Sequence, residues 1–141
     1  MKTYIGTKMI QAEPCAAWKD AGEHIAGDPG YKVVYPDGYE SWSPKEVFDE
    51  AYRPVDGMSF GLAIEAAKKG KRIARKGWNG KEQYVELASC IAYVGTDGII
   101  VNAEHEAIGN RALAFVGTSG VQMGWLASQA DMLAEDWRIV E

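Results

Sequence analysis

The sequence predicts an α+β protein: a small antiparallel β-sheet with one main helix, preceded by a small module made of a β-hairpin and a helix. Short β-rich runs alternate with turn sequences such as "TDG" at 96–98, which is the pattern of antiparallel hairpins. One stretch, 60–67, repeats apolar residues at the spacing of a helix face. The length of 141 residues suits one ordinary domain or two very small ones.

A break between two modules is predicted in "YRPVDGM", residues 52–58. Pro54 ends a preceding helix, and the pair "DG" that follows is a turn sequence. The sequence is therefore divided into a small N-terminal module at 1–57 and a second domain at 58–141.

The N-terminal module is predicted to contain a strand at 3–12 and a hairpin in "YKVVYPDGYESW", turning at 36–38. A helix is predicted in "SPKEVFDEAYR". Ser43 is expected to cap it, Pro44 fits the first helical position, and Glu46 completes a capping box.

The second domain is predicted to open with a helix capped by Ser59 and ended by Gly70 in the left-handed conformation. Strands follow in "RIARKGW" and "QYVELA", hairpins follow around "TDG" and "TSG", and the chain ends with a turn or short helix in "SQADMLAED" and the strand "WRIVE". A single helix can cover only one face of so small a sheet. Association with other copies is therefore expected to cover the apolar surface that remains.

The formal net charge is −5, with 15 basic and 20 acidic side chains. Affinity for duplex DNA comes largely from neutralising phosphates, so this charge argues against a duplex-binding protein. No apolar run approaches the roughly 20 residues of a membrane helix. The N-terminal sequence "MKTYIGTKMIQAEP" lacks the apolar core of a secretory signal. We therefore expect a cytoplasmic protein that binds neither duplex nucleic acid nor a membrane.

Metal and cofactor chemistry is not predicted. Cys15 and Cys90 lie far apart and form no CxxC pair, and the two histidines are His24 and His105. A zinc site needs a cluster of such ligands. The sequence "KKGKRIARKGWNGK" has glycines and lysines without the spacing of a phosphate-binding P-loop. We expect no metal, no cofactor and no nucleoside triphosphatase activity.

Catalytic groups are sparse as well. The sequence has no GxSxG motif, and His105 lies in the polar stretch "NAEHEAIGN" without an orienting partner nearby in sequence. Asp131, Glu135 and Asp136 are close in sequence, but Ser128 with Asp131 also fits a helix-capping pair. Without a second catalytic group these acids do not make a hydrolase, so we expect a protein that is not an enzyme. The alternative is a phosphodiesterase or glycohydrolase that uses these carboxylates.

Two tryptophans give the strongest indication of a binding site. In "KGWNGKEQYV", residues 76–85, Trp78 stands among glycines, an amide and positive charge rather than in an apolar run. Trp125 likewise adjoins Gly124. An indole in such a turn can stack on a flat ring, and stacking on a nucleobase contributes about 1–3 kcal/mol. Trp137 is instead predicted to be a core or sheet residue.

Polar residues near these tryptophans suit the other parts of a nucleotide. Amides can read an adenine edge, carboxylates can accept hydrogen bonds from ribose hydroxyls, and cations can meet a phosphate. The predicted amides are Asn79 and Gln129, the carboxylates are Asp131 or Asp136, and the cations are Arg75, Lys76 or Lys81. These residues predict a pocket for a nucleotide-like molecule with no apparatus for breaking it.

Two motifs resemble a known family. "MSFGLAIEAAKKGKRIARKGWNGK" and "GWLASQADMLAEDWRIVE" are similar to the second family of Thoeris anti-defence proteins, which bacteriophages and prophages carry. The similarity covers 58–141. Family members commonly have proline where this chain has Ala127. The matching motif positions are Trp78, Asn79, Trp125, Gln129, Asp131, Asp136 and Trp137.

The resemblance implies a small α+β protein that assembles as a homotetramer. Family members bind cyclic ADP-ribose isomers made by TIR-domain immune enzymes and hold them without cleaving them. Some also sequester cyclic di- or trinucleotides of the related CBASS defence at a separate site. The expected function is to bind and sequester such signals in the infected bacterial host, with Trp78 and Trp125 stacking on the ligand.

The N-terminal module, 1–57, resembles a short phage-encoded module of no known activity, which supports a phage or prophage origin. A further interpretation follows from the residues alone: a structural or interaction protein of a phage, in which the tryptophans only pack.

Overall fold

The computed structural model describes residues 1–20, 22, 24–78, 82–102 and 110–141. The chain divides into two compact units, Met1–Arg53 and Pro54–Glu141. The sequence-based boundary, after residue 57, lies four residues from this division. Within the described ranges, no helix is long and apolar enough to span a bilayer.

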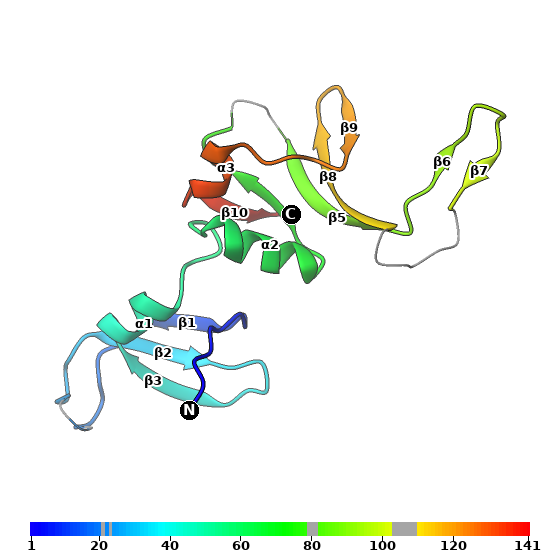
Figure 1. Ribbon diagram of the computed structural model, residues 1–141. Helices are drawn as coiled ribbons and strands as arrows, with labels where there is room; N and C mark the ends of the chain where they lie inside the picture. The colour runs from blue at the N-terminus through cyan, green and yellow to red at the C-terminus, as the bar shows by residue number, and fades with distance from the viewer. Residues whose placement is uncertain (21, 23, 79–81, 103–109) are drawn as a thin grey trace. The chain divides into compact units, whose positions relative to one another are not determined.

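The first unit is a three-stranded antiparallel sheet followed by a short helix (Figure 1). Its strands are β1 (Gln11–Pro14), β2 (Gly30–Val34) and β3 (Glu40–Pro44), in that order across the sheet, and its helix is α1 (Lys45–Ala51). The predicted hairpin is confirmed as β2–β3, whose turn is closed by a hydrogen bond from the Tyr35 amide to the Tyr39 carbonyl.

Two details predicted for this unit are wrong. The first strand begins at Gln11, and residues 1–10 form no strand and are almost wholly exposed, because β-rich composition gives a strand only where neighbouring strands pair with it. Ser43 does not cap α1. It pairs with Tyr31 inside the β2–β3 ladder, so Pro44 occupies the cap position and no side chain caps the helix.

Aromatic stacking fixes α1 on its sheet. The Phe48 ring stacks on that of Tyr31, with centroids 4.0 Å apart and planes inclined by 16°. Gly30 is required at its position because a Cβ atom there would lie 2.4 Å from both the Ser43 carbonyl oxygen and the Trp42 ring. The Trp42 indole in turn donates a hydrogen bond to the Cys15 carbonyl at 2.7 Å.

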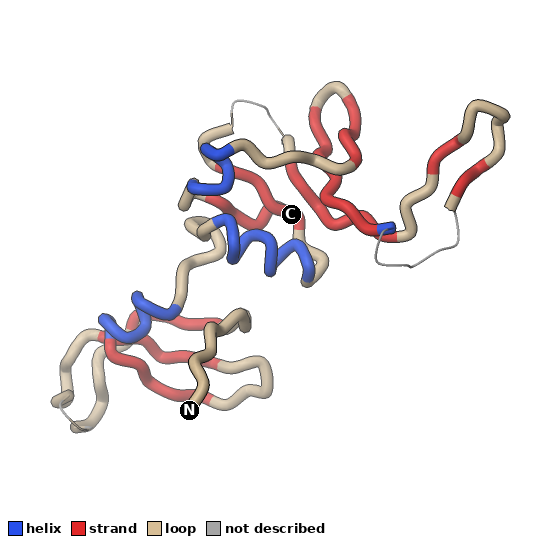
Figure 2. The backbone as a smooth tube through the Cα atoms, viewed as in Figure 1, coloured by secondary structure: helices blue, strands red, loops and turns tan. Residues whose placement is uncertain are grey.

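The second unit is built on a five-stranded, fully antiparallel sheet in the order β10-β4-β5-β8-β9. Figure 2 shows the strands of this unit in red and its helices in blue. A separate hairpin, β6–β7, and the helices α2 and α3 complete the part of this unit that the structure describes. The bounds are α2 (Phe60–Lys68), β4 (Arg72–Arg75), β5 (Tyr84–Ser89), β6 (Tyr93–Val94), β7 (Ile100–Val101), β8 (Arg111–Gly117), β9 (Gly120–Met123), α3 (Gln129–Leu133) and β10 (Trp137–Val140).

The main helix begins and ends as the sequence predicts. The Ser59 hydroxyl accepts a hydrogen bond from the Leu62 amide at 3.3 Å, which satisfies one of the unpaired donors of the first turn. Gly70, with φ of +86°, follows the helix in the left-handed region that glycine adopts without steric cost.

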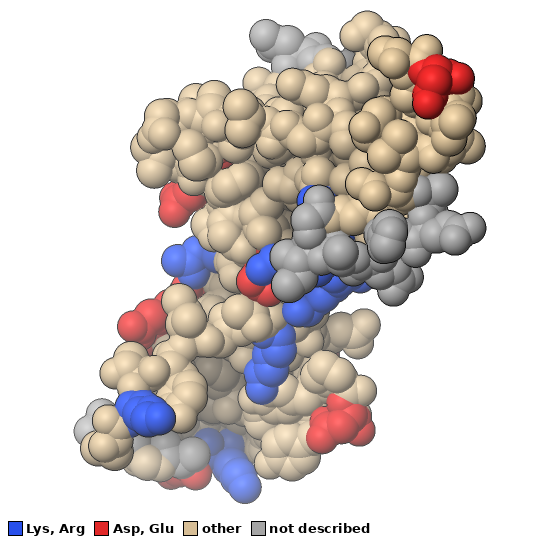
Figure 3. Space-filling model, turned by 45° about the vertical axis from the view of Figure 1, so that its right-hand side comes forward, with Lys and Arg blue, Asp and Glu red and all other residues tan. Residues whose placement is uncertain are grey.

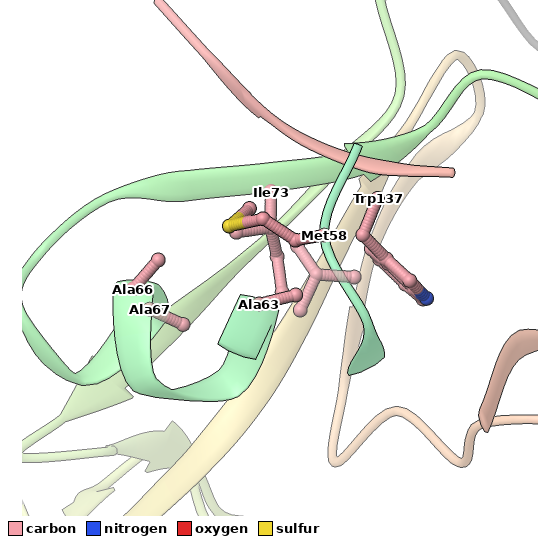
Figure 4. Close-up of a cluster of buried hydrophobic side chains, with 7 residues drawn as sticks. Met58, Ala63, Ala66, Ala67, Ile73 and Trp137 are labelled. Carbon is pink, nitrogen blue, oxygen red and sulfur yellow. The ribbon is translucent and has the colours of Figure 1, made fainter. Parts of the chain in front are cut away.

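The core of the unit lies between α2 and one face of the sheet. Three buried alanines, Ala63, Ala66 and Ala67, let the helix approach the sheet closely. Figure 4 shows them directed toward Ile73 of β4, with Trp137 of β10 beside the group. The predicted fold class is confirmed: a small antiparallel sheet with one main helix, preceded by a smaller β-and-helix unit.

Strand register assigns each side chain to one of the two sheet faces. The cross-strand row of Ile139, Ile73, Val85 and Phe115 belongs to the face that α2 covers. The opposite face carries small and apolar side chains over β8 and β9. These are Ala112, Ala114, Val116, Val121 and Met123.

Candidate functional site

An aromatic cluster brings together residues from five separate segments of the second unit. Trp78 follows β4 in a turn closed by a hydrogen bond from its own amide to the Arg75 carbonyl at 3.3 Å. Trp125 follows β9, and its amide donates to the Leu113 carbonyl at 2.9 Å. The aromatic cluster consists of Phe60, Trp78, Phe115, Trp125 and Trp137.

Trp78 is the centre of this cluster. Its ring lies 6.0 Å from that of Trp125, 5.3 Å from that of Trp137 and 5.4 Å from that of Phe115, with interplanar angles of 61° to 79°. Such edge-to-face pairs are favoured by the aromatic quadrupole and define ring orientation. Trp137 is fully buried, whereas Trp78 and Trp125 are half-buried. The two indoles predicted to stack on a ligand therefore lie together, on the outside of a rigid aromatic core.

Arg75 forms an acid–arginine network beside this cluster with Asp131 and Asp136. Its Nη1 donates to Asp131 Oδ1 at 2.8 Å, and its Nε donates to Asp136 Oδ1 at 2.9 Å. The Gly77 amide donates to Asp136 Oδ2 at 2.8 Å. The side chains of Arg75, Asp131 and Asp136 are 19%, 14% and 33% exposed, so the three charges are partly shielded from water.

Asp131 connects the acid–arginine network to Trp78 and Trp137. Its Oδ1 accepts a hydrogen bond from Trp78 Nε1 at 3.0 Å in addition to the one from Arg75. Its backbone carbonyl accepts from Trp137 Nε1 at 2.8 Å. The same residue therefore fixes the rotation of the Trp78 ring and of the Trp137 ring.

Asp131 is itself held by the capping box of α3. The Ser128 hydroxyl accepts from the Asp131 amide at 3.1 Å, and Asp131 Oδ2 accepts from the Ser128 amide at 3.3 Å. The capping pair predicted from the sequence is confirmed. It is compatible with the other contacts of Asp131 because the two carboxylate oxygens take different donors.

Replacing the capping hydroxyl tests how far α3 supports the site. We expect Ser128→Ala to lower the free energy of unfolding by about 1 kcal/mol, because the Asp131 amide loses its acceptor. Ser119→Ala, in the exposed turn between β8 and β9, is the matched control and should change it by less than about 0.5 kcal/mol. Urea unfolding of both variants measures the difference. Equal stabilities would contradict a supporting role for the cap.

Opposing effects set the pKa values of the network. Burial would raise the pKa of Asp131, but hydrogen bonds from Arg75, Trp78 and Ser128 outweigh burial and lower it. The hydrogen bond from Arg75 lowers the pKa of Asp136 against a smaller effect of burial, and the Gly77 amide adds to the lowering. Hydrogen bonds to Asp136 and Asp131 raise the pKa of Arg75. All three groups are therefore charged at neutral pH.

Acid should weaken the second unit through these two carboxylates. Since their pKa values are lower in the folded protein, the unfolded chain takes up protons first as the pH falls. The stabilisation is complete above the unfolded carboxyl pKa of about 3.9 and is lost as the pH falls below it. We expect urea unfolding to show this loss as the pH falls below about 4. Asp136→Asn should reduce the loss of stability in acid. If the acid dependence of this variant equals that of the wild-type chain, the effect does not come from Asp136. Glu135→Gln, which removes an exposed charge outside the network, is the control.

The structure gathers most of the site residues predicted from the sequence. Trp78 and Trp125 lie in the aromatic cluster, and Arg75, Asp131 and Asp136 form the network beside it. Gln129 is the exposed first residue of α3, two positions before Asp131. Asn79 and Lys81, together with His105, lie outside the described residues. Contact of any of these side chains with a ligand stays a prediction.

Three residues of the site were missed by sequence reasoning. Phe60 and Phe115 have the pattern of ordinary core positions, and only the fold brings them to the tryptophans. Gly77 contributes a backbone donor, which residue type does not reveal. In the part of the chain that the structure describes, no group of three or more His, Cys, Asp or Glu residues could hold a metal ion.

The fold and the site define a small α+β protein whose charged network supports half-buried indoles. The family described as "Thoeris anti-defense 2-like domain" (Tad2-like) matches residues 58–140. A curated relative named "Thoeris anti-defense 2", from Bacillus phage SP01, is 38% identical over 86 residues, which are 59% of this chain and 94% of that protein. The chain therefore belongs to the Thoeris anti-defence 2-like family, and its role is in phage anti-defence.

Proposed function

We propose that the second unit sequesters a cyclic nucleotide immune signal by binding it without cleaving it. The observation that carries this proposal is the pair of half-buried indoles, Trp78 and Trp125. Their ring centroids lie 6.0 Å apart within the aromatic cluster. A site with fixed aromatic rings loses little conformational entropy when a flat base binds, so more of the stacking energy contributes to affinity. Family membership supports the signal class: cyclic ADP-ribose isomers, and cyclic di- or trinucleotides at a separate site.

The polar contacts of the ligand are assigned to groups around the indoles. Arg75 uses Nε and Nη1 for the two aspartates, so its Nη2 donors would meet a phosphate. Lys81 would add a second cation, and Asn79 and Gln129 would read the base. Asp131 and Asp136 keep lone pairs for ribose hydroxyls, because each carboxylate oxygen can accept two hydrogen bonds.

The pKa values and the hydrogen bonds of Asp131 and Asp136 favour sequestration over hydrolysis. A general acid or base works best when its pKa lies near the working pH. The pKa values of Asp131 and Asp136 are instead lowered, and both carboxylates are engaged with Arg75. A phosphodiesterase or glycohydrolase built on them would have to break the contacts that orient Trp78. The proposed protein is therefore not an enzyme, needs no cofactor, and acts stoichiometrically.

The proposed setting is the cytoplasm of the infected bacterium, where the protein acts as a homotetramer that contacts neither membrane nor duplex nucleic acid. Apolar side chains exposed on the second unit support self-association, since large exposed patches are unfavourable on a monomer. A protein that captures a signal without destroying it must be present in amounts comparable to that signal.

Titration calorimetry of the full chain tests the proposal. The probes are the two ribose–ribose-linked isomers of cyclic ADP-ribose and one cyclic trinucleotide, with ADP-ribose as the open-chain control. We expect saturable binding of at least one cyclic probe, at a defined ratio of ligand to protein, and weaker binding of ADP-ribose. Heat that never saturates for any cyclic probe would overturn the sequestration proposal.

A further inference from the structure

Asp136 holds three consecutive residues of the turn that carries Trp78. The turn from Arg75 to Trp78, here called the indole turn, begins where β4 ends. Asp136 Oδ1 accepts a hydrogen bond from Arg75 Nε at 2.9 Å, and its backbone carbonyl accepts one from the Lys76 amide at 3.2 Å. Its Oδ2 accepts from the Gly77 amide at 2.8 Å. One residue therefore fixes the backbone that leads to the indole.

Gly77 permits this contact because it has no Cβ atom. Its φ does not lie in the left-handed region, so backbone conformation alone does not require glycine here. A Cβ atom would lie 3.0 Å from Asp136 Oδ2 and 3.3 Å from Arg75 Nη2. Both distances are shorter than ordinary van der Waals contact, so a larger residue would displace the carboxylate or the turn. The glycine therefore marks a close approach of a carboxylate to the backbone.

The Trp78 indole is held from two sides. The indole turn fixes its backbone, and Asp131 accepts a hydrogen bond from its Nε1 at 3.0 Å. Asp131 lies in α3 and Asp136 directly precedes β10, so both acids belong to one short segment of the chain. The ring is only half-buried, and packing alone therefore leaves it more freedom than a fully buried ring has. These contacts determine how the ring is presented to a ligand.

We propose that Asp136 is a positioning residue of the signal-binding site, which acts through the indole turn and sets the orientation of the Trp78 ring. Gly77 admits the carboxylate that does so. Groups that support a binding residue from behind determine how well its geometry is kept. The inference rests on the proposed function, because it concerns the affinity of that site. It differs from a hydrogen bond between Asp136 and ribose, because it requires no contact with the ligand.

Asp136→Asn removes one contact and keeps the size of the side chain. Asparagine has a single acceptor oxygen, and its nitrogen only donates. The charge-assisted hydrogen bond from Arg75 is the stronger one, so it keeps the oxygen. The new NH₂ group then faces the Gly77 amide, which is also a donor. The indole turn therefore loses its hydrogen bond while Arg75 keeps its own.

Charge alone predicts the opposite result for this variant. Acidic side chains lie in separate patches on the face that Figure 3 shows. Removing one of them should leave the affinity for an anionic nucleotide unchanged or slightly stronger, because the repulsion of like charges is reduced. A weaker affinity of Asp136→Asn would therefore come from lost geometry or a lost contact, and not from the net charge.

A double-mutant cycle, measured by calorimetry with the tightest-binding cyclic nucleotide, tests the proposal. We expect Asp136→Asn to weaken binding by at least about 5-fold, but to change the affinity of the Trp78→Ala chain by less than about 2-fold. Gly77→Ala should depend on Trp78 in the same way. Glu135→Gln, which removes an exposed neighbouring acid, is the first control. Gly61→Ala is the second, since a Cβ atom at this exposed glycine of α2 meets nothing within 4 Å. Circular dichroism checks that each variant is folded.

The indole N–H resonance of Trp78 gives a second measurement that needs no ligand. Heteronuclear NMR of the free chain identifies this resonance by its loss in Trp78→Phe. We expect Asp136→Asn and Gly77→Ala to shift it. The indole resonance of Trp42, which donates to the Cys15 carbonyl in the first unit, should stay in place.

The outcomes separate the positioning role from the alternatives. Unchanged or tighter binding by folded Asp136→Asn would overturn it. An equal loss of affinity in the wild-type and Trp78→Ala chains would also overturn it, because Asp136 would then contact the ligand directly. If no cyclic nucleotide binds, the proposed function fails, and the NMR measurement decides the inference alone. A shifted Trp78 resonance would then establish that Asp136 orients the indole, and an unshifted one would overturn this.

Discussion

Trp78→Ala is expected to weaken binding of the cyclic nucleotide by about 5- to 150-fold, because it removes a stacking surface that contributes about 1–3 kcal/mol. It should also lower the free energy of unfolding by up to about 3 kcal/mol, since the ring packs against Trp125, Trp137 and Phe115. Trp78→Phe separates the two effects. It keeps an aromatic ring in the core but loses the hydrogen bond to Asp131 and part of the stacking area.

Calorimetry with the tightest-binding cyclic nucleotide measures this effect, and Trp18→Ala is its control. Trp18 is an exposed tryptophan of the first unit, so its removal should change neither binding nor the stability of the second unit. If Trp78→Ala and Trp78→Phe remain folded and bind the nucleotide as tightly as the wild-type chain, the indole only packs and the site lies elsewhere.

Arg75→Ala has the largest expected effect on stability. It leaves two partly buried carboxylates without the cation that bridges them. Removing one partner of a buried ion pair lowers the free energy of unfolding by about 3–5 kcal/mol. Because these groups are partly exposed, we expect Arg75→Ala to lower it by about 2–4 kcal/mol. Arg75→Lys keeps the charge but cannot donate from two nitrogens, so it should fall between the wild-type chain and Arg75→Ala. Urea unfolding measures all three.

Arg72→Ala provides the matched control for Arg75. Arg72 is a surface arginine on the same strand, with one hydrogen bond to Glu86 at 3.4 Å and its guanidinium over the Tyr84 ring. Exposed ion pairs contribute about 0–1 kcal/mol, so this variant should lose little stability. Equal losses for Arg72→Ala and Arg75→Ala would contradict a bridging role for Arg75 between α3 and β4.

The sequence was sufficient where local chemistry decides the structure. Ser59 and Gly70 predicted the ends of α2, and the turns at "TDG" and "TSG" predicted the hairpins, because caps and turns depend on residues a few positions apart. The same reasoning failed at Ser43. A capping sequence there is overridden by pairing with β2, which depends on a contact between distant parts of the chain.

The candidate site could be predicted only as a set of residue types. Arg75 and Asp131 are separated by 56 residues, and their ion pair follows from the β4–β10 pairing that places α3 beside the end of β4. Sequence alone cannot show that an acid predicted to bind ribose also orients a tryptophan. Trp137 was predicted as a core residue from its place in a strand, and its complete burial confirms this.

The central claim, capture without cleavage, is tested most directly by recovering the bound signal. The wild-type chain is incubated with the tightest-binding cyclic nucleotide, freed of unbound ligand, and heat-denatured, and the released nucleotide is quantified by chromatography and mass spectrometry. The account predicts that all of the bound nucleotide returns with unchanged mass and retention, even after prolonged incubation. Release of a linear or hydrolysed product in amounts exceeding the protein would contradict it and make the chain an enzyme.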